Sequence, residues 1–97
     1  GKVRGMEVIF DLGEQKHVYV EIRSRKGQDF QIRSASWELL RDGKTETGGS
    51  CVIIDHVLDI FLYPQQAGIY ILRVTYEIAN EVLVENIIIK VYKWRTL

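Results

Sequence analysis

Hydrophobic and polar residues alternate along most of this chain with the two-residue period of a half-buried β-strand. The clearest case is the run from His17 to Arg23, in which Val18, Val20 and Ile22 share one face. Similar alternation covers residues 7–12, 30–41, 45–54, 57–63, 70–78 and 82–94. No window carries an apolar stripe of helical period. The pattern therefore predicts seven strands joined by short polar turns.

One turn and one irregularity can be placed from the sequence. The dipeptide Asp42-Gly43 lies between two alternating runs, which is the strongest short-range indication of a β-hairpin. Within residues 30–41 the apolar positions change parity between Ile32 and Ala35. This change predicts a β-bulge near residues 33–34, or a change of sheet. Residues 48–49, a pair of glycines, are expected to interrupt the strand at 45–54.

Seven short alternating strands in 97 residues are typical of an antiparallel β-sandwich of immunoglobulin type, with a small barrel as the main alternative. This length predicts one domain over residues 1–97, in which residues 1–5 form a flexible leader that could include a tag remnant. Parity on the central strands predicts a core between two sheets that contains Val20, Ile22, Trp37, Leu39, Ile60, Leu62, Tyr70, Leu72 and Val74.

The segment from Phe30 to Tyr92 resembles an immunoglobulin-like domain. Gly68-x-Tyr70 stands where that fold places its tyrosine corner, and Trp37 could be the counterpart of its core tryptophan. The resemblance implies that the Tyr70 hydroxyl bonds to backbone a few residues upstream. Leu72 occupies the place of an antibody-type cysteine, so the chain is more similar to small immunoglobulin-like proteins of Firmicutes prophages and bacterial surfaces. That likeness implies a virion or a bacterial cell surface as its location.

Composition argues against several classes of function. Lys plus Arg and Asp plus Glu both number 13, which leaves no excess of positive charge for nucleic acid. No apolar run approaches the roughly 18 residues of a membrane helix. A single cysteine, Cys51, rules out an intrachain disulfide, and two histidines without metal-ligand spacing make a zinc site unexpected. We therefore expect no cofactor, metal, nucleic acid or membrane partner.

Three features could carry chemistry, and each has a simpler structural interpretation. Asp55-His56 would point to opposite faces of a strand, or would cap a turn. Cys51 lacks a positioned base and is most simply a small buried side chain. A basic cluster around one loop could bind an anion, but nearby carboxylates favour a solvated loop; its members are Arg23, Arg25, Lys26 and Arg33. We expect no catalytic residues and no enzyme.

The final strand carries apolar residues on both parities. Because a strand in a two-layer sandwich should have one wet face, this pattern predicts a contact with another copy or a neighbouring domain through Ile88, Tyr92 and Trp94. The alternative is a bulge at Glu85-Asn86 that would bury Ile88 within its own chain.

The sequence thus favours a structural or protein-interaction module that acts by packing and edge-strand pairing. The alternative is a carbohydrate-binding sandwich that stacks a polysaccharide on exposed aromatic rings, with Tyr19, Tyr63, Tyr92 and Trp94 as the candidate residues.

Overall fold

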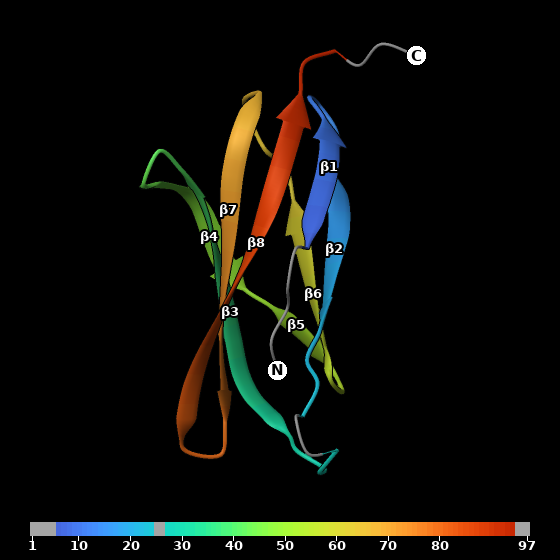
Figure 1. Cartoon of the computed structure of the whole chain (residues 1–97), viewed down its shortest axis with the longest axis vertical. Helices are drawn as coiled ribbons and strands as arrows, with labels where there is room; N and C mark the ends of the chain where they lie inside the picture. The colour runs from blue at the N-terminus through green and yellow to red at the C-terminus, as the bar shows by residue number, and fades with distance from the viewer. Residues whose placement is uncertain (1–5, 25–26, 95–97) are drawn as a thin grey trace.

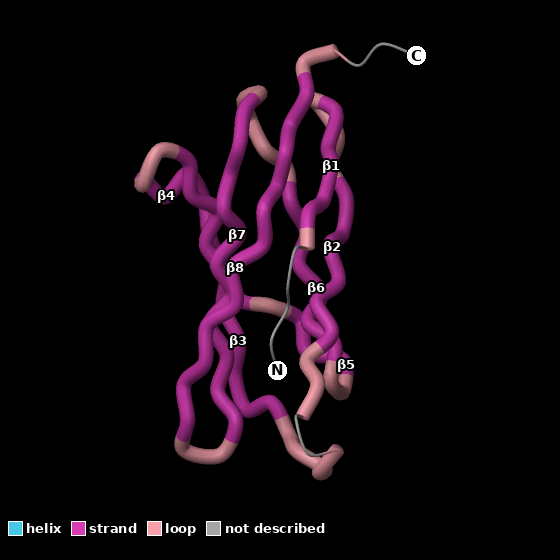
Figure 2. The backbone as a smooth tube through the Cα atoms, in the orientation of Figure 1, coloured by secondary structure: helices cyan, strands magenta, loops and turns pink. Residues whose placement is uncertain are grey.

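The computed structural model describes residues 6–24 and 27–94, and this part of the chain consists of strands and loops (Figure 2). The leader predicted over residues 1–5 lies outside the described residues. Nowhere in the described ranges is there a helix of the length and apolarity that would cross a membrane. The strands are β1 (Glu7–Asp11), β2 (Lys16–Glu21), β3 (Ile32–Arg41), β4 (Lys44–Ser50), β5 (Val52–Ile54), β6 (Val57–Leu62), β7 (Gly68–Ile78) and β8 (Glu81–Tyr92).

The strands form two sheets that face each other across one hydrophobic core (Figure 1). The larger sheet has five strands in the order β1-β8-β7-β3-β4, and the smaller has three in the order β2-β6-β5. Strand β1 runs parallel to β8, whereas every other recorded pair is antiparallel. An all-β, two-layer fold was predicted correctly, but the expectation of seven wholly antiparallel strands was wrong.

The additional strand arises because the chain changes sheets at Cys51. Strand β4 continues through both glycines and pairs with β3, so the predicted interruption at residues 48–49 does not occur there. After Cys51, strand β5 pairs with β6 in the opposite sheet. The Cys51 amide donates to the carbonyl oxygen of Ala35 at 3.0 Å, and its side chain is buried. The crossover is therefore fixed by one backbone bond and one buried side chain.

The predicted hairpin at Asp42-Gly43 is confirmed. Arg41 pairs with Lys44 across the turn, and the two central residues have φ of 53° and 75°. Positive φ at both positions matches the twist of paired strands, and glycine adopts it without steric cost. The predicted bulge is also confirmed, because the register of β3 against β7 shifts between Ile32 and Ser34.

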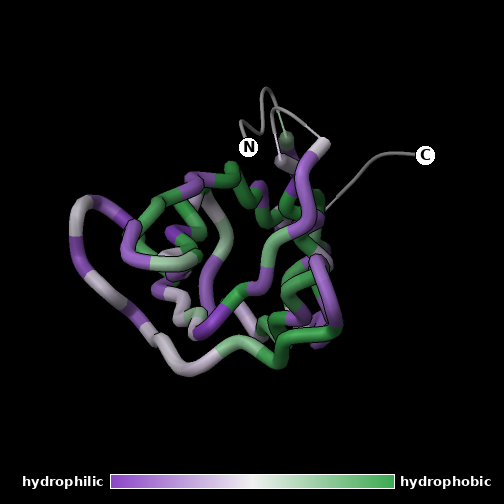
Figure 3. Tube along the Cα trace, turned by 90° about the horizontal axis from the view of Figure 1, so that it is seen from below, coloured by the Kyte–Doolittle hydropathy of each residue, from purple (hydrophilic) through white to green (hydrophobic). Residues whose placement is uncertain are grey.

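The core follows the predicted parity closely. Eight of the nine predicted core residues are buried, and the exception, Trp37, is half-buried. Its indole lies beside Gly49 of β4, 3.5 Å from where a Cβ on that glycine would stand, at the sheet edge. Hydrophobic and hydrophilic stretches alternate along the strands when the molecule is viewed from below (Figure 3). Because apolar side chains from both sheets fill the space between them, the fold is a two-layer structure and no closed barrel forms.

Strand β8 lies inside the larger sheet. A two-residue turn joins it to β7, and Ala79 in that turn has φ of 53°. The register runs without a shift past Glu85 and Asn86, so the alternative of a bulge there is wrong. Strand β7 covers one edge of β8, and β1 covers the other edge only from Ile88 to Tyr92.

Candidate functional site

The outward face of the five-stranded sheet carries an apolar patch at one end. Pairing places Ile88 of β8, Ile71 of β7 and Leu40 of β3 side by side in one row across three strands. Ile69 and Ile9 lie in the next row, on either side of Lys90. The alternating neighbours of these residues, including Phe10, Leu39 and Ile87, are buried, so the row itself faces outward. We call Ile9, Leu40, Ile69, Ile71 and Ile88 the apolar patch.

The three residues predicted to make contacts lie on or beyond this strand. Ile88 is 37% exposed and stands in the centre of the patch. Tyr92, at the end of β8, is 39% exposed and is paired with Asp11 of β1. Trp94 follows the strand and is 80% exposed, with the Lys93 ammonium 4.8 Å from its ring centre. The structure therefore brings Ile88 and Tyr92 to one sheet face and leaves Trp94 past its end.

The sequence analysis did not identify the other members of the patch. Their parity was readable, since Ile69 and Ile71 alternate with the buried Tyr70 and Leu72. What could not be read was the strand order, which brings residues from four strands together. A sheet face becomes a continuous surface once its register is known.

The remainder of this face is mostly polar and carries both signs of charge. Glu7 and Lys90 form an ion pair of 3.2 Å at the patch border. Arg73 donates to the side-chain oxygen of Asn86 at 3.4 Å and is paired in register with Glu38. Farther from the patch, small hydroxyl side chains line a shallow hollow; they are Ser34, Ser36, Ser50 and Thr75. Val82 and Val84 are exposed among these polar groups, so the sheet face has an apolar end and a mixed end.

The outward face of the three-stranded sheet carries an aromatic cluster, which we define as His17, Tyr19 and Phe61. The imidazole of His17 lies parallel to the Tyr19 ring, with 6.0 Å between ring centres, and meets the Phe61 ring edge-on at 4.9 Å. Asp59 is the register partner of Tyr19, and its carboxylate accepts a hydrogen bond from His17 Nδ1 at 2.6 Å. Tyr19 and Tyr92 belong to different sheets, so the four aromatic residues predicted as one platform are split.

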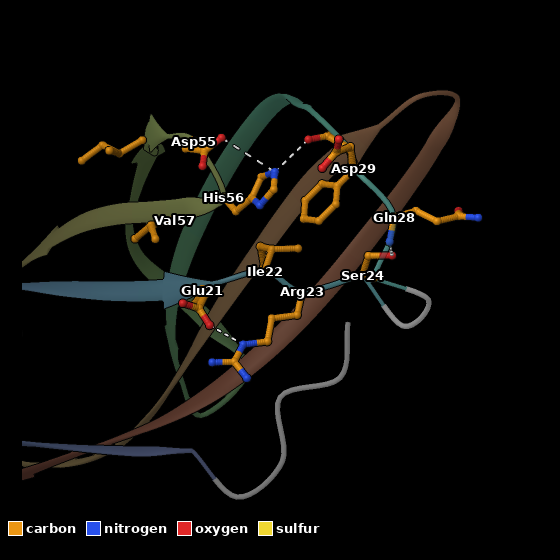
Figure 4. Close-up of a pocket in the computed structure, with 12 residues that line it drawn as sticks. Glu21, Ile22, Arg23, Ser24, Gln28, Asp29, Asp55, His56 and Val57 are labelled. Atoms are coloured by element: carbon orange, nitrogen blue, oxygen red, sulfur yellow. Dashed lines mark hydrogen bonds and ion pairs between the residues drawn. The ribbon is translucent and has the colours of Figure 1, made fainter.

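A hollow of about 440 Å³ opens where the end of β2 meets the turn between β5 and β6 (Figure 4). Asp55 and His56 form that turn, and Asp55 has φ of 55°. His56 Nε2 lies 2.9 Å from the carbonyl oxygen of Phe30 and therefore donates to it, because a carbonyl only accepts. The two rings also stack, with centres 4.0 Å apart, and the His56 carbonyl accepts from the Ile22 amide at 2.9 Å. His56 holds the loop after β2 against the β5–β6 turn.

This hollow offers little for acid–base chemistry. His56 Nε2 is 3.7 Å from Asp55 Oδ1, which is too long for an orienting hydrogen bond. Arg23 is bonded to Glu21 on the rim. Among the described residues, no three His, Cys, Asp or Glu side chains are grouped so as to hold a metal ion. The Asp55-His56 pair occupies a turn, as one of its two interpretations predicted.

The other candidate features also have structural partners. Burial raises the pKa of the Cys51 thiol to about 11, which is the opposite of what a nucleophilic cysteine needs. Arg33 lies 3.4 Å from Glu77 and donates to the Ala79 carbonyl at 2.8 Å. Arg25 and Lys26 of the predicted basic cluster lie outside the described residues. The described arginines of that cluster are thus paired with carboxylates, which favours a solvated loop.

Tyr70 forms the predicted corner and reaches one partner that was not predicted. Its hydroxyl accepts from the Gln66 amide at 3.2 Å, which confirms the expected bond to upstream backbone. The same hydroxyl donates to the carboxylate of Glu46 on β4 at 2.8 Å. Burial, and next the bond to Glu46, raise the pKa of Tyr70. Nothing in the sequence indicated Glu46, because 24 residues separate the two side chains.

Comparison of the chain with protein-family models, with curated proteins and with solved structures found no match. The class of this protein is therefore described from its fold and its surface alone. It is a small all-β domain of two facing sheets, and it carries an apolar patch on the outward face of the larger sheet.

Proposed function

We propose that this chain is a non-catalytic, immunoglobulin-like module that works by protein contact through the apolar patch. The exposure of Ile9, Ile69 and Ile88, beside the half-buried Leu40 and Ile71, carries this proposal. Strand β7 pairs with β8 from Glu81 to Val91 and β1 pairs with it from Ile88 to Tyr92, so beside the patch its backbone is already hydrogen-bonded on both edges. The outward side chains are what remains for recognition, and contiguous exposed apolar patches mark interaction sites.

The strand order supports the immunoglobulin-like part of the proposal. In variable-type immunoglobulin domains, strands G, F and C share a sheet with the added strand C′, and strands B, E and D lie in the other sheet. In the same order, these places are taken here by β8, β7, β3 and β4, and by β2, β6 and β5. The order β8-β7-β3-β4 opposite β2-β6-β5 has this arrangement. The bond from the Gln66 amide to the Tyr70 hydroxyl, at the corner before β7, is a second support.

A second copy of the chain is the occupant that we propose for the patch. The five strands have 5, 12, 11, 10 and 7 residues, and at about 3.3 Å per residue and 4.8 Å per strand they give a face of roughly 700 Å². A standard interface needs about 800 Å² on each partner, so this face fits a weak dimer. The face carries Glu38 and Glu77 as well as Arg73 and Lys90, so two copies related by a twofold axis would not repel each other. A structural role in a virion or on a bacterial surface belongs to the same proposal and rests on the resemblance around Gly68-x-Tyr70.

Sedimentation velocity from about 10 µM to 1 mM tests this function. We expect a reversible monomer–dimer equilibrium, with a dissociation constant in the micromolar to millimolar range because the patch is only part of the face. Ile88→Lys places a charge in the central row and should weaken the dimer at least tenfold.

The matched control is Ile54→Lys, which changes an equally β-branched, exposed residue on the outward face of the smaller sheet. It should leave association unchanged. A wild-type chain that stays monomeric at 1 mM, with amide NMR shifts independent of concentration, would contradict self-association through this face. Loss of association in the control as well as in Ile88→Lys would show that the contact lies elsewhere.

A further inference from the structure

The smaller sheet presents a second surface of different chemistry on the opposite side of the sandwich. Tyr19 is 58% exposed and Phe61 is 49% exposed, although both belong to the regular β2–β6 ladder. His17 bridges them, parallel to one ring and edge-on to the other. The His17 ring restrains both neighbours, so less side-chain entropy remains to be lost when a ligand packs on them.

A carboxylate sits within this aromatic surface. Asp59 lies opposite Tyr19 on one side and Val52 on the other, and its side chain is largely shielded from solvent. An ionised carboxylate has about four acceptor positions. Among the described residues, the recorded partner of Asp59 is His17 Nδ1, at 2.6 Å. The 15% of the Asp59 side chain that is open to solvent therefore offers an acceptor beside exposed rings.

This combination selects the chemical class of ligand. A purely apolar ligand that covered the rings would also cover the carboxylate, and a buried acceptor without a partner is costly. A sugar ring does not incur that cost, because its C–H face packs on an aromatic ring while its hydroxyl groups donate to the carboxylate. Acidic ligands are disfavoured, since Asp59 and Glu21 both lie on this face of β2 and β6.

We infer that the outward face of the β2-β6-β5 sheet is a binding site for uncharged glycans. Tyr19 and Phe61 supply the apolar contact, Asp59 accepts hydrogen bonds from ligand hydroxyl groups, and His17 positions that carboxylate. The site is on the sheet opposite the apolar patch, so it is independent of the proposed function.

Affinity electrophoresis of the full chain tests this inference. The gels contain mixed-linkage β-glucan, xylan or galactomannan as neutral polysaccharides, and polygalacturonate as the acidic one. We expect retardation in at least one neutral gel and none in polygalacturonate. Tyr19→Ala should lower the affinity about 5- to 100-fold, as for loss of one aromatic stacking partner. Asp59→Asn should lower it about tenfold or more, because a charged acceptor becomes a neutral one.

The matched control is Tyr92→Ala, which removes an exposed ring from the other sheet and should bind like the wild type. Circular dichroism checks that every variant is folded. The chain is then titrated with an oligosaccharide of the same polysaccharide that retards it in the gel. Amide NMR shifts should change at residues 17–19 and 59–61. Absence of retardation in all three neutral gels would overturn the inference, and so would equal binding by Tyr19→Ala and the wild type. Ile88→Lys leaves this site intact, so failure here is distinguishable from failure of the dimer.

Discussion

Replacing Tyr70 by phenylalanine removes one oxygen atom and two hydrogen bonds from the corner between β6 and β7. The ring keeps its fully buried place in the core, so the change isolates the hydroxyl. That hydroxyl accepts from the Gln66 amide at 3.2 Å and donates to Glu46 at 2.8 Å. The bond to the carboxylate links β4, at the sheet edge, to the start of β7.

The expected loss of stability follows from these two bonds. A hydrogen bond to a charged group contributes about 1.5–3 kcal/mol and a neutral one about 0.5–1.5 kcal/mol. Glu46 lies on an exposed strand and can be solvated again after the change, so the charged bond counts at the lower end of its range. We expect Tyr70→Phe to lower the free energy of unfolding by about 2–3 kcal/mol. For a domain of this size, that corresponds to a fall in Tm of about 10 °C.

Urea unfolding, followed by tryptophan fluorescence and circular dichroism, measures this loss. The slope m should stay constant, because the buried surface does not change. A double-mutant cycle with Glu46→Gln should give a coupling energy of about 1 kcal/mol for the Tyr70–Glu46 bond. Tyr92→Phe is the control, since its exposed ring should tolerate the change within about 0.5 kcal/mol. A Tyr70→Phe variant as stable as the wild type, or a coupling near zero, would refute this account of the corner.

Two further predictions concern strand packing and alkaline stability. A Cβ on Gly48 would lie 2.8 Å from the backbone oxygen of Trp37, whereas one on Gly49 would make ordinary contacts with the indole at 3.5 Å and beyond. In urea unfolding, Gly48→Ala should therefore cost about 1–3 kcal/mol and Gly49→Ala little; equal effects would contradict the close approach of β4 to β3. Burial, and next the charge of Glu85, raise the pKa of Tyr76 from 10.0 to about 12. A raised folded-state pKa means that stability is fully present below pH 10 and is lost as pH rises toward 12, by up to about 2–3 kcal/mol. The stability of Tyr76→Phe should fall less over that window, and parallel curves would show that Tyr76 is not responsible.

The parts of the fold that depend on neighbouring residues could be predicted from the sequence. Alternation placed Val20, Ile60 and Leu72 in the core because each strand has one dry face. The hairpin at Asp42-Gly43 was predictable because its turn needs two residues with positive φ. The bulge near Ser34 was predictable because a shift of one residue exchanges the two faces of a strand.

The parts that depend on strand order could not be predicted. The glycines at 48–49 predicted an interruption close to the crossing at Cys51, but they could not show that the chain continues in the opposite sheet. Parallel pairing of β1 with β8 joins the two ends of the described chain, and local patterns carry no information on such pairs. For the same reason the candidate sites were only partly found. Ile88 was identified from its own strand, whereas Leu40 joined it through the register of two intervening ladders.

The position of β1 also decides how the last strand can act. Had β8 been an edge strand, its apolar residues would have suggested a partner strand added to the sheet, with backbone bonds supplying most of the affinity. Because β1 pairs with β8 from Ile88 to Tyr92, a partner at this end must instead approach the sheet face, where Ile88 and Ile71 stand side by side. Contacts of that kind depend on side-chain shape and are sensitive to one substitution in the central row. In this half of β8 the parallel strand satisfies the backbone and thereby leaves recognition to the outward side chains.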